Sequence, residues 1–180
     1  AKEYPVRQLR ENISMVMQDV FLFSNTITDN IAFGNPFADS DYVRQMAVVA
    51  DADAFISRMP QGYETIVGER GVGLSGGQKQ RISLARALVK DPSILILDDT
   101  TSAVDMETES KIQTELAKLT DEKTTFIIAH RISSVREADL ILMMEKGRVV
   151  EQGTHEELVS KGGKYYEVYQ KQLGLSGGDT

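Results

Sequence analysis

Apolar residues recur along this chain in two spacings, and each spacing predicts a different kind of element. Short apolar runs bounded by turn residues are typical of strands, and they occur at 13–17, 94–97, 124–129, 140–145 and 148–151. Longer stretches with apolar residues every three or four positions predict helices, at 25–30, 39–58, 75–89, 105–119, 155–160 and 164–173. Strands that alternate with helices predict an α/β fold with a mostly parallel sheet and ligand chemistry at the carboxyl ends of its strands.

Local signals refine several of these elements. The run 94–97 is continuously apolar, which is typical of a strand buried on both faces, and 124–129 predicts another buried strand. Ser75 is a favourable N-cap for the helix that follows it, and the helical stretch 39–58 is expected to break near Asp51. The helical region from about 26 to 90 interrupts the strand–helix alternation, so we expect a helical subdomain inserted into the sheet domain.

Composition narrows the class of protein. The chain has 180 residues, of which 41% are hydrophobic and 26% charged, as in an ordinary soluble globular domain. Its net charge of −7 argues against nucleic acid as a main partner. The absence of cysteine excludes disulfides and thiolate chemistry, and two histidines are too few for a dedicated zinc site. No apolar run approaches the ~20 residues of a membrane span.

Two motifs carry chemistry. The stretch 74–78 (Leu-Ser-Gly-Gly-Gln) is a glycine-rich turn that opens a helix, and a helix N-terminus can cradle phosphate. The stretch 94–98 (Ile-Leu-Ile-Leu-Asp) begins 20 residues later and is an apolar strand that ends in an acid, which can hold Mg²⁺. This pairing resembles the signature motif and Walker B of ABC-type ATPases.

The order of motifs resembles the nucleotide-binding domain of an exporter-type ABC transporter over 13–173. Gln18 resembles the Q-loop, 65–71 the loop ahead of the signature, 74–78 the signature, 94–98 Walker B, 102–105 the D-loop, His130 the switch histidine, and 147–155 a further stretch typical of the family. The resemblance implies a P-loop NTPase-like fold over 1–174, with the signature in a helical subdomain at about 26–90 and the C-terminal part of the α/β core at 91–174. The last residues, 175–180, predict a flexible tail.

The chain departs from the family pattern in two places. No match to G-x-x-x-x-G-K-[ST] occurs in the sequence, so we expect the N-terminal strands and the Walker A P-loop to be missing and the sheet to expose an apolar edge. Asp99 stands where the family usually has a catalytic Glu. Asp is shorter by one methylene, so the resemblance implies either the low-activity site of a heterodimeric exporter or a tolerated variant.

The resemblance implies a role for each matching residue. Catalysis would fall to Asp99, His130 and Gln18. The phosphates of ATP held by the opposite subunit would be contacted by Ser75, Gly76, Gly77 and Gln78. The dimer-facing D-loop would use Ser102 and Asp105. Mg²⁺ would be held by Asp98 and Gln18.

Plainer structural roles are also available. Ser75 could simply cap its helix, and Ser102 and Asp105 could cap the helix at 105–119. Aromatic residues after the Q-loop and in the helical region could form either core or a groove for a membrane domain. They are Phe21, Phe23, Phe33, Phe37 and Tyr42.

The resemblance implies an ATPase subunit at the cytoplasmic face of the cell membrane. It would use ATP and Mg²⁺, pair with a second nucleotide-binding domain, and couple ATP binding and hydrolysis to export through a transmembrane domain. Without a P-loop, the chain alone is expected to be a poor ATPase. The alternatives are a non-catalytic binding or dimerisation module and a DNA-repair ATPase lobe, which the acidic charge disfavours. The sequence names no transported substrate.

Overall fold

The computed structural model describes residues 4–120 and 123–174. The chain divides into two compact units, Ala1–Ile128 and Ala129–Thr180, and each is described by itself. The tail predicted at 175–180 lies outside the described residues.

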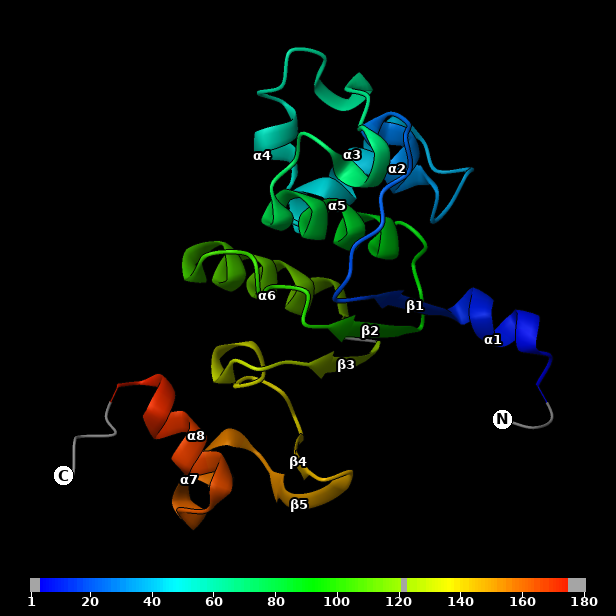
Figure 1. Cartoon of the computed structure of the whole chain (residues 1–180). Helices are drawn as coiled ribbons and strands as arrows, with labels where there is room; N and C mark the ends of the chain where they lie inside the picture. Colours follow the sequence, from blue (N-terminus) through cyan, green and yellow to red (C-terminus); the bar gives the residue numbers. More distant parts are fainter. Residues whose placement is uncertain (1–3, 121–122, 175–180) are drawn as a thin grey trace. The chain divides into compact units, whose positions relative to one another are not determined.

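The first unit joins a parallel sheet to a group of helices (Figure 1). Its strands are β1 Ile13–Val16, β2 Ile94–Asp98 and β3 Thr124–Ile128. Its α-helices are α1 Val6–Asn12, α2 Ile27–Ala32, α3 Ser40–Val49, α4 Asp53–Ile56, α5 Gly76–Leu88 and α6 Met106–Thr120, with short 3₁₀ turns at Gly62–Glu64 and Glu69–Gly71. The predicted elements are therefore present, and α1 is additional. Because α1 buries none of its residues, it has no apolar periodicity to reveal it.

The sheet brings the ends of all three strands to one edge. Its order is β1-β2-β3, and both pairings are parallel, as the strand–helix alternation predicts. The register aligns Val16 with Leu97 and Leu97 with Ile127, so the segments that follow each strand leave from the same edge. That edge is where the predicted ligand chemistry belongs.

Burial of the sheet is one-sided, which corrects two predictions. Val16, Leu95 and Leu97 are buried in one core with residues of α5 and α6, whereas Phe126 is 55% and Ile128 52% exposed. Side chains alternate between the faces of a strand, and the helices of this core lie against one face only. Neither β2 nor β3 is therefore buried on both sides, although every residue of 94–97 is apolar.

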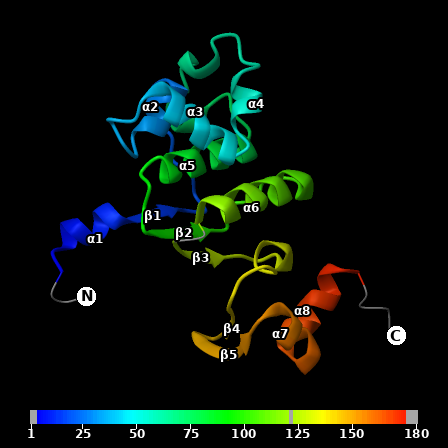
Figure 2. The same cartoon turned by 180° about the vertical axis from the view of Figure 1, so that it is seen from behind.

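The helical region packs around α5 (Figure 2). The predicted break near Asp51 is present, since α3 ends at Val49, α4 begins at Asp53, and Asp51 has a φ of 52°. The Arg81 guanidinium on α5 donates to both the carbonyl oxygen (2.7 Å) and the carboxylate (2.8 Å) of Asp51. This pair fixes the bend between α3 and α4 to the first turns of α5.

The second unit is a hairpin with two helices. A turn at Lys146-Gly147 joins β4 Ile141–Glu145 to β5 Arg148–Gly153 in an antiparallel pair. The helices α7 His155–Lys161 and α8 Lys164–Gln172 follow. The unit's core contains Ile132, Ile141, Leu158 and Tyr165. The Glu151 carboxylate accepts hydrogen bonds from the N–H groups of Lys164 (2.7 Å) and Tyr165 (3.0 Å), which ties β5 to the start of α8.

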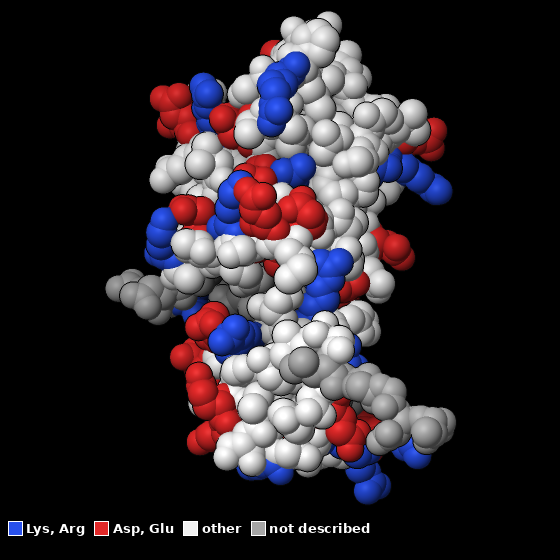
Figure 3. Space-filling model, turned by 90° about the vertical axis from the view of Figure 1, so that its left-hand side faces the viewer, with Lys and Arg blue, Asp and Glu red and all other residues white. Residues whose placement is uncertain are grey.

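Charges are mixed on the surface. On the face drawn in Figure 3, Lys and Arg side chains are interspersed with Asp and Glu side chains over the described residues.

Candidate functional site

The signature turn is the N-terminus of α5. The Ser75 hydroxyl accepts a hydrogen bond from the Gln78 N–H (3.3 Å), and the Gln78 side chain accepts one from the Ser75 N–H (2.9 Å), which completes a capping box. The predicted N-cap is therefore present. The capping box binds the N–H of Gln78, the third residue of the helix. The N–H groups of Gly76 and Gly77 have no acceptor within the helix, as at any α-helix start.

Gly77 lets this helix start approach the loop after β2. A Cβ on Gly77 would lie 2.8 Å from the carbonyl oxygen of Ala103 and 3.1 Å from Val104. A Cβ on Gly76 would meet Ala103 at an ordinary 3.4 Å. Only the second glycine of the motif is thus required by packing within the chain, and Gly76 stands exposed beside it.

Asp98 and Asp99 stand where β2 meets the sheet's carboxyl edge. Asp98 is the last residue of the strand and is half-buried. Asp99 turns away from the strand with a φ of 48°, and its N–H donates to the carbonyl oxygen of Ile128 at 2.8 Å. Asp is among the few side chains that adopt this left-handed conformation readily, which gives a local physical reason for Asp rather than Glu at position 99.

The loop at 102–105 has a firm internal structure. The Asp105 carboxylate accepts hydrogen bonds from the N–H and the hydroxyl of Thr108, both at 2.9 Å, so Asp105 caps α6. These two bonds, with that from the backbone N–H first, hold the pKa of the Asp105 carboxyl below its ordinary value. Ser102 instead donates to the Asp99 carbonyl oxygen at 3.0 Å, so of the two predicted caps only Asp105 acts as one.

Gln18 and His130 both follow strands. Gln18 is exposed in the bend after β1, and the parallel register puts that bend at the same edge as Asp98. His130 comes two residues after β3 and is exposed, and its carbonyl oxygen accepts a hydrogen bond from Gln172 at the end of α8. The described geometry brings Gln18, Asp98, Asp99 and the α5 N-terminus together in one unit, whereas His130 belongs to the other unit.

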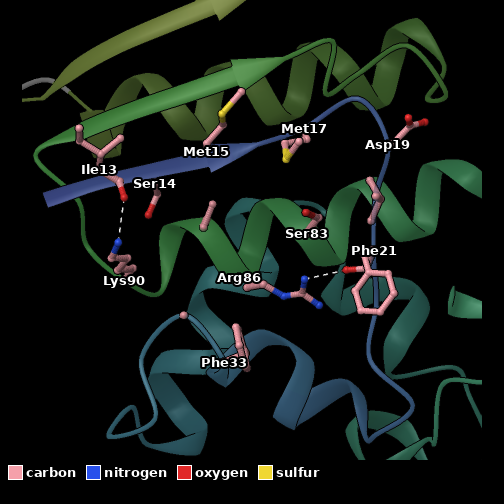
Figure 4. Close-up of a pocket in the computed structure, with 13 residues that line it drawn as sticks. Ile13, Ser14, Met15, Met17, Asp19, Phe21, Phe33, Ser83, Arg86 and Lys90 are labelled. Carbon is pink, nitrogen blue, oxygen red and sulfur yellow. Dashed lines mark hydrogen bonds between the residues drawn. The ribbon is translucent and has the colours of Figure 1, made fainter. Parts of the chain in front are cut away.

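Two of the five aromatic residues, Phe21 and Phe33, line a cavity, whereas Tyr42 packs against the buried core. Leu22 is buried, but Phe21, Phe33 and Phe37 are 53%, 62% and 97% exposed. Phe21 and Phe33 line a cavity of about 460 Å³ between β1 and α5 (Figure 4). For these phenylalanines the core interpretation is wrong.

Arg86 also lines this cavity. Its guanidinium donates to the Phe21 carbonyl oxygen (2.8 Å) and to both the backbone and side-chain oxygens of Asn30 (each 2.7 Å), as Figure 4 shows for Phe21. The same cation lies 5.3 Å from the ring centroid of Phe23. Burial lowers the pKa of the Arg86 guanidinium. Sequence reasoning missed Arg86, because its partners Phe21 and Asn30 lie 65 and 56 positions away, and it missed the fully buried Asn30, which belongs to no recognised motif.

The donor set at the sheet edge suits a magnesium ion that is shared with phosphate. Among the described residues, no group of three or more His, Asp and Glu side chains is placed to hold a metal. Mg²⁺ in nucleotide sites commonly takes one or two carboxylates and completes its shell with water and phosphate oxygens. The half-buried Asp98 at a strand tip fits that mode of binding.

Comparison with known proteins identifies the class. The sequence profile of the family described as "ABC transporter" matches residues 1–102. The chain therefore belongs to the ABC transporter family, as the order of its motifs predicts.

Individual relatives place it among ATP-binding proteins of exporters. The chain is 55% identical to the "Uncharacterized ABC transporter ATP-binding protein YknU" of Bacillus subtilis (strain 168) over 94% of its length and 29% of the relative's. It is 48% identical to an "ATP-dependent lipid A-core flippase" of Chromohalobacter salexigens, over 96% and 30% of the two lengths. A structure described as a bacterial Atm1-family ABC exporter with ATP bound matches with a TM-score of 0.90 and 44% identity, over 93% of this chain and 30% of that one.

The chain spans about 30% of the length of these relatives. In the part of the chain that the structure describes, no helix has both the length and the apolar character to cross a membrane.

Proposed function

We propose that this chain supplies the signature, Walker B and switch elements of an ABC exporter ATPase, in which ATP binding and hydrolysis drive transport across a membrane. The observation that carries the proposal is the contact between the α5 N-terminus and the loop that follows Asp98. Gly77 packs against Ala103 there, so the helix start proposed to bind phosphate lies in contact with the loop that follows the strand tip proposed to bind the metal.

Each residue would act through its own position. Ser75 and the N–H groups of Gly76 and Gly77 would bind the γ-phosphate of ATP held by an opposite domain, with Gln78 fixing the helix start. Asp99 would hydrogen-bond the attacking water, Gln18 would sense the membrane domain, and the exposed Ser102 would face the dimer partner. His130 would hydrogen-bond the γ-phosphate.

Asp98, with Gln18, would hold the Mg²⁺ that accompanies ATP. The ion, when bound, neutralises charge on the terminal phosphates. Within the chain, the half-buried Asp98 is presented for this role by its pairing with Ile128 across the sheet.

The cavity between β1 and α5 would receive a helical segment of the exporter's membrane domain. It combines the apolar side chains of Phe21 and Phe33 with charged side chains of both signs, Asp19, Arg86 and Lys90, so an amphipathic segment that carries polar side chains beside its apolar face fits it best. Phe33→Ala in the intact exporter should weaken substrate stimulation of ATPase activity. Phe37→Ala is the matched control, because Phe37 is 97% exposed outside this cavity. Equal stimulation in the wild type and Phe33→Ala would contradict this docking.

ATP hydrolysis by the intact protein that carries this chain tests the proposed activity. Asp98→Asn should abolish Mg²⁺-dependent hydrolysis, whereas Asp41→Asn, at an exposed position of α3, should leave it unchanged. Calorimetry of ATP–Mg²⁺ with the 180-residue chain tests whether these residues bind nucleotide without a Walker A motif. Micromolar binding would contradict the expectation that these residues bind ATP poorly without a Walker A motif. Hydrolysis that survives in Asp98→Asn would contradict the assigned site.

We further propose that residues 26–90 act as a helical subdomain within an ATPase domain over 1–174, with 91–174 as the C-terminal part of its core. The competing function is a non-catalytic binding or dimerisation module. Absence of ATP hydrolysis by the intact wild-type protein would favour that module.

A further inference from the structure

Gln80 lies two residues beyond the signature motif and connects α5 to the loop after Asp98. It is 6% exposed, which is low for an amide side chain on the second turn of a helix. A buried amide is retained at little cost only when both of its ends are hydrogen-bonded.

Both ends of the Gln80 amide are used, and by one loop. Its oxygen accepts from the N–H of Ala103 at 3.2 Å. Its nitrogen donates to the hydroxyl of Ser102 at 3.2 Å and to the carbonyl oxygen of Asp99 at 3.4 Å. The orientation of the amide is unambiguous, because a backbone N–H faces its oxygen and a backbone carbonyl faces its nitrogen.

The opposite side of the loop is fixed as well. The Asp99 N–H donates to Ile128 of β3 at 2.8 Å, so the peptide units on both sides of Asp99 are bound, one to the sheet and one to Gln80. This arrangement holds Asp99 at its φ of 48°, a left-handed conformation that is uncommon for residues other than glycine.

We propose that Gln80 is a positioning residue that sets Asp99 and the 102–103 segment relative to the signature helix. The inference rests on the proposed function. There, Ser75 acts on nucleotide held by the opposite domain, whereas Asp98 and Asp99 act on nucleotide at their own sheet edge. If α5 moves when Ser75 contacts the nucleotide of the opposite domain, Gln80 would therefore move with it and shift Asp99, which orients the attacking water at the chain's own nucleotide.

The direct test is amide hydrogen exchange at Ala103 in the full 180-residue chain and in the intact protein, without nucleotide. Gln80→Met removes the acceptor while keeping side-chain length, so the Ala103 N–H should exchange at least about tenfold faster. Gln45→Met makes the same change at an exposed position of α3 and should leave Ala103 unaffected. Gln80→Glu keeps the accepting oxygen and should preserve most of the protection.

The kinetic test uses ATP hydrolysis by the intact protein. Gln80→Met should lower kcat by roughly tenfold or more with KM within about twofold, because displacement of a catalytic group by about 1 Å can cost a hundredfold in rate. Unchanged Ala103 exchange in Gln80→Met, or kcat equal to that of Gln45→Met, would overturn the proposal. Absence of hydrolysis in the wild type would instead count against the proposed function and leave the exchange result to decide the role of Gln80.

Discussion

The Gln172 side-chain amide forms one hydrogen bond with the backbone of His130 and one with the backbone of Ile132. Its amide nitrogen donates to the His130 carbonyl oxygen at 2.7 Å, and its amide oxygen accepts from the Ile132 N–H at 2.8 Å. The last turn of α8 thus fixes the segment that carries the proposed switch histidine, although the two residues are far apart in sequence.

Loss of these two hydrogen bonds should lower the rate of ATP hydrolysis more than the affinity for nucleotide. Gln172→Met in the intact protein should lower kcat for ATP hydrolysis by roughly five- to tenfold while leaving nucleotide affinity within about twofold, because His130 loses its fixed backbone. Gln170→Met is the control on the same helix, since Gln170 donates to Tyr166 instead. Equal kcat values for the two variants would show that Gln172 does not position His130.

Arg86 should be a major contributor to the stability of the first unit. Arg86→Met removes the cationic donor to the backbone and side-chain oxygens of the fully buried Asn30, which should cost about 1–3 kcal/mol. Urea unfolding measures the loss. Arg7→Met removes a guanidinium that is 90% exposed in its pair with Glu11, and that change should cost less than about 0.5 kcal/mol.

The two signature glycines should differ when replaced by alanine. Gly77→Ala forces a Cβ to 2.8 Å from the Ala103 carbonyl oxygen, and such overpacking typically costs about 1–3 kcal/mol. Gly76→Ala meets only ordinary contact and gains helix propensity, so its stability should equal or exceed that of the wild type. Thermal unfolding of the two variants gives the comparison, and a Gly77→Ala protein as stable as Gly76→Ala would contradict the close packing.

The link between β5 and α8 should weaken in acid. Hydrogen bonds from Tyr165 and then Lys164 hold the pKa of the Glu151 carboxyl below its ordinary 4.5. A group with a lowered folded pKa contributes stability that is complete above the unfolded pKa and is lost as the pH falls through the folded pKa. The melting temperature should therefore fall below about pH 4.5, and this acid-dependent fall should be smaller in Glu151→Gln. An equal fall in Glu151→Gln would assign the acid sensitivity to other groups.

Local sequence signals predicted most elements, because strand runs, caps and turns act over a few residues. The Ser75 N-cap and the break at Asp51 are of this kind. What could not be predicted depends on distant parts of the chain. The exposure of Phe126 depends on which elements cover the sheet, and an apolar strand looks the same in sequence whether one face or both are covered.

The candidate site divides in the same way. Ser75, Asp98 and Asp105 could be found because each belongs to a recognisable local motif. Gln80 and Arg86 could not, since their partners lie 19 to 23 and 56 to 65 positions away and no local pattern marks such pairs. The left-handed backbone at Asp99 was also invisible in the sequence, and it gives a conformational reason for the shorter acid.

The parallel sheet β1-β2-β3, which helices cover on one face only, affects the solubility of the purified chain. Met15, Phe126 and Ile128 are exposed apolar side chains on one face of the sheet. Exposed apolar patches of this kind promote association with other molecules. Solubility should therefore be set by this face rather than by the chain's strong negative charge. Detergent or a lower protein concentration should suppress turbidity more effectively than a change of salt.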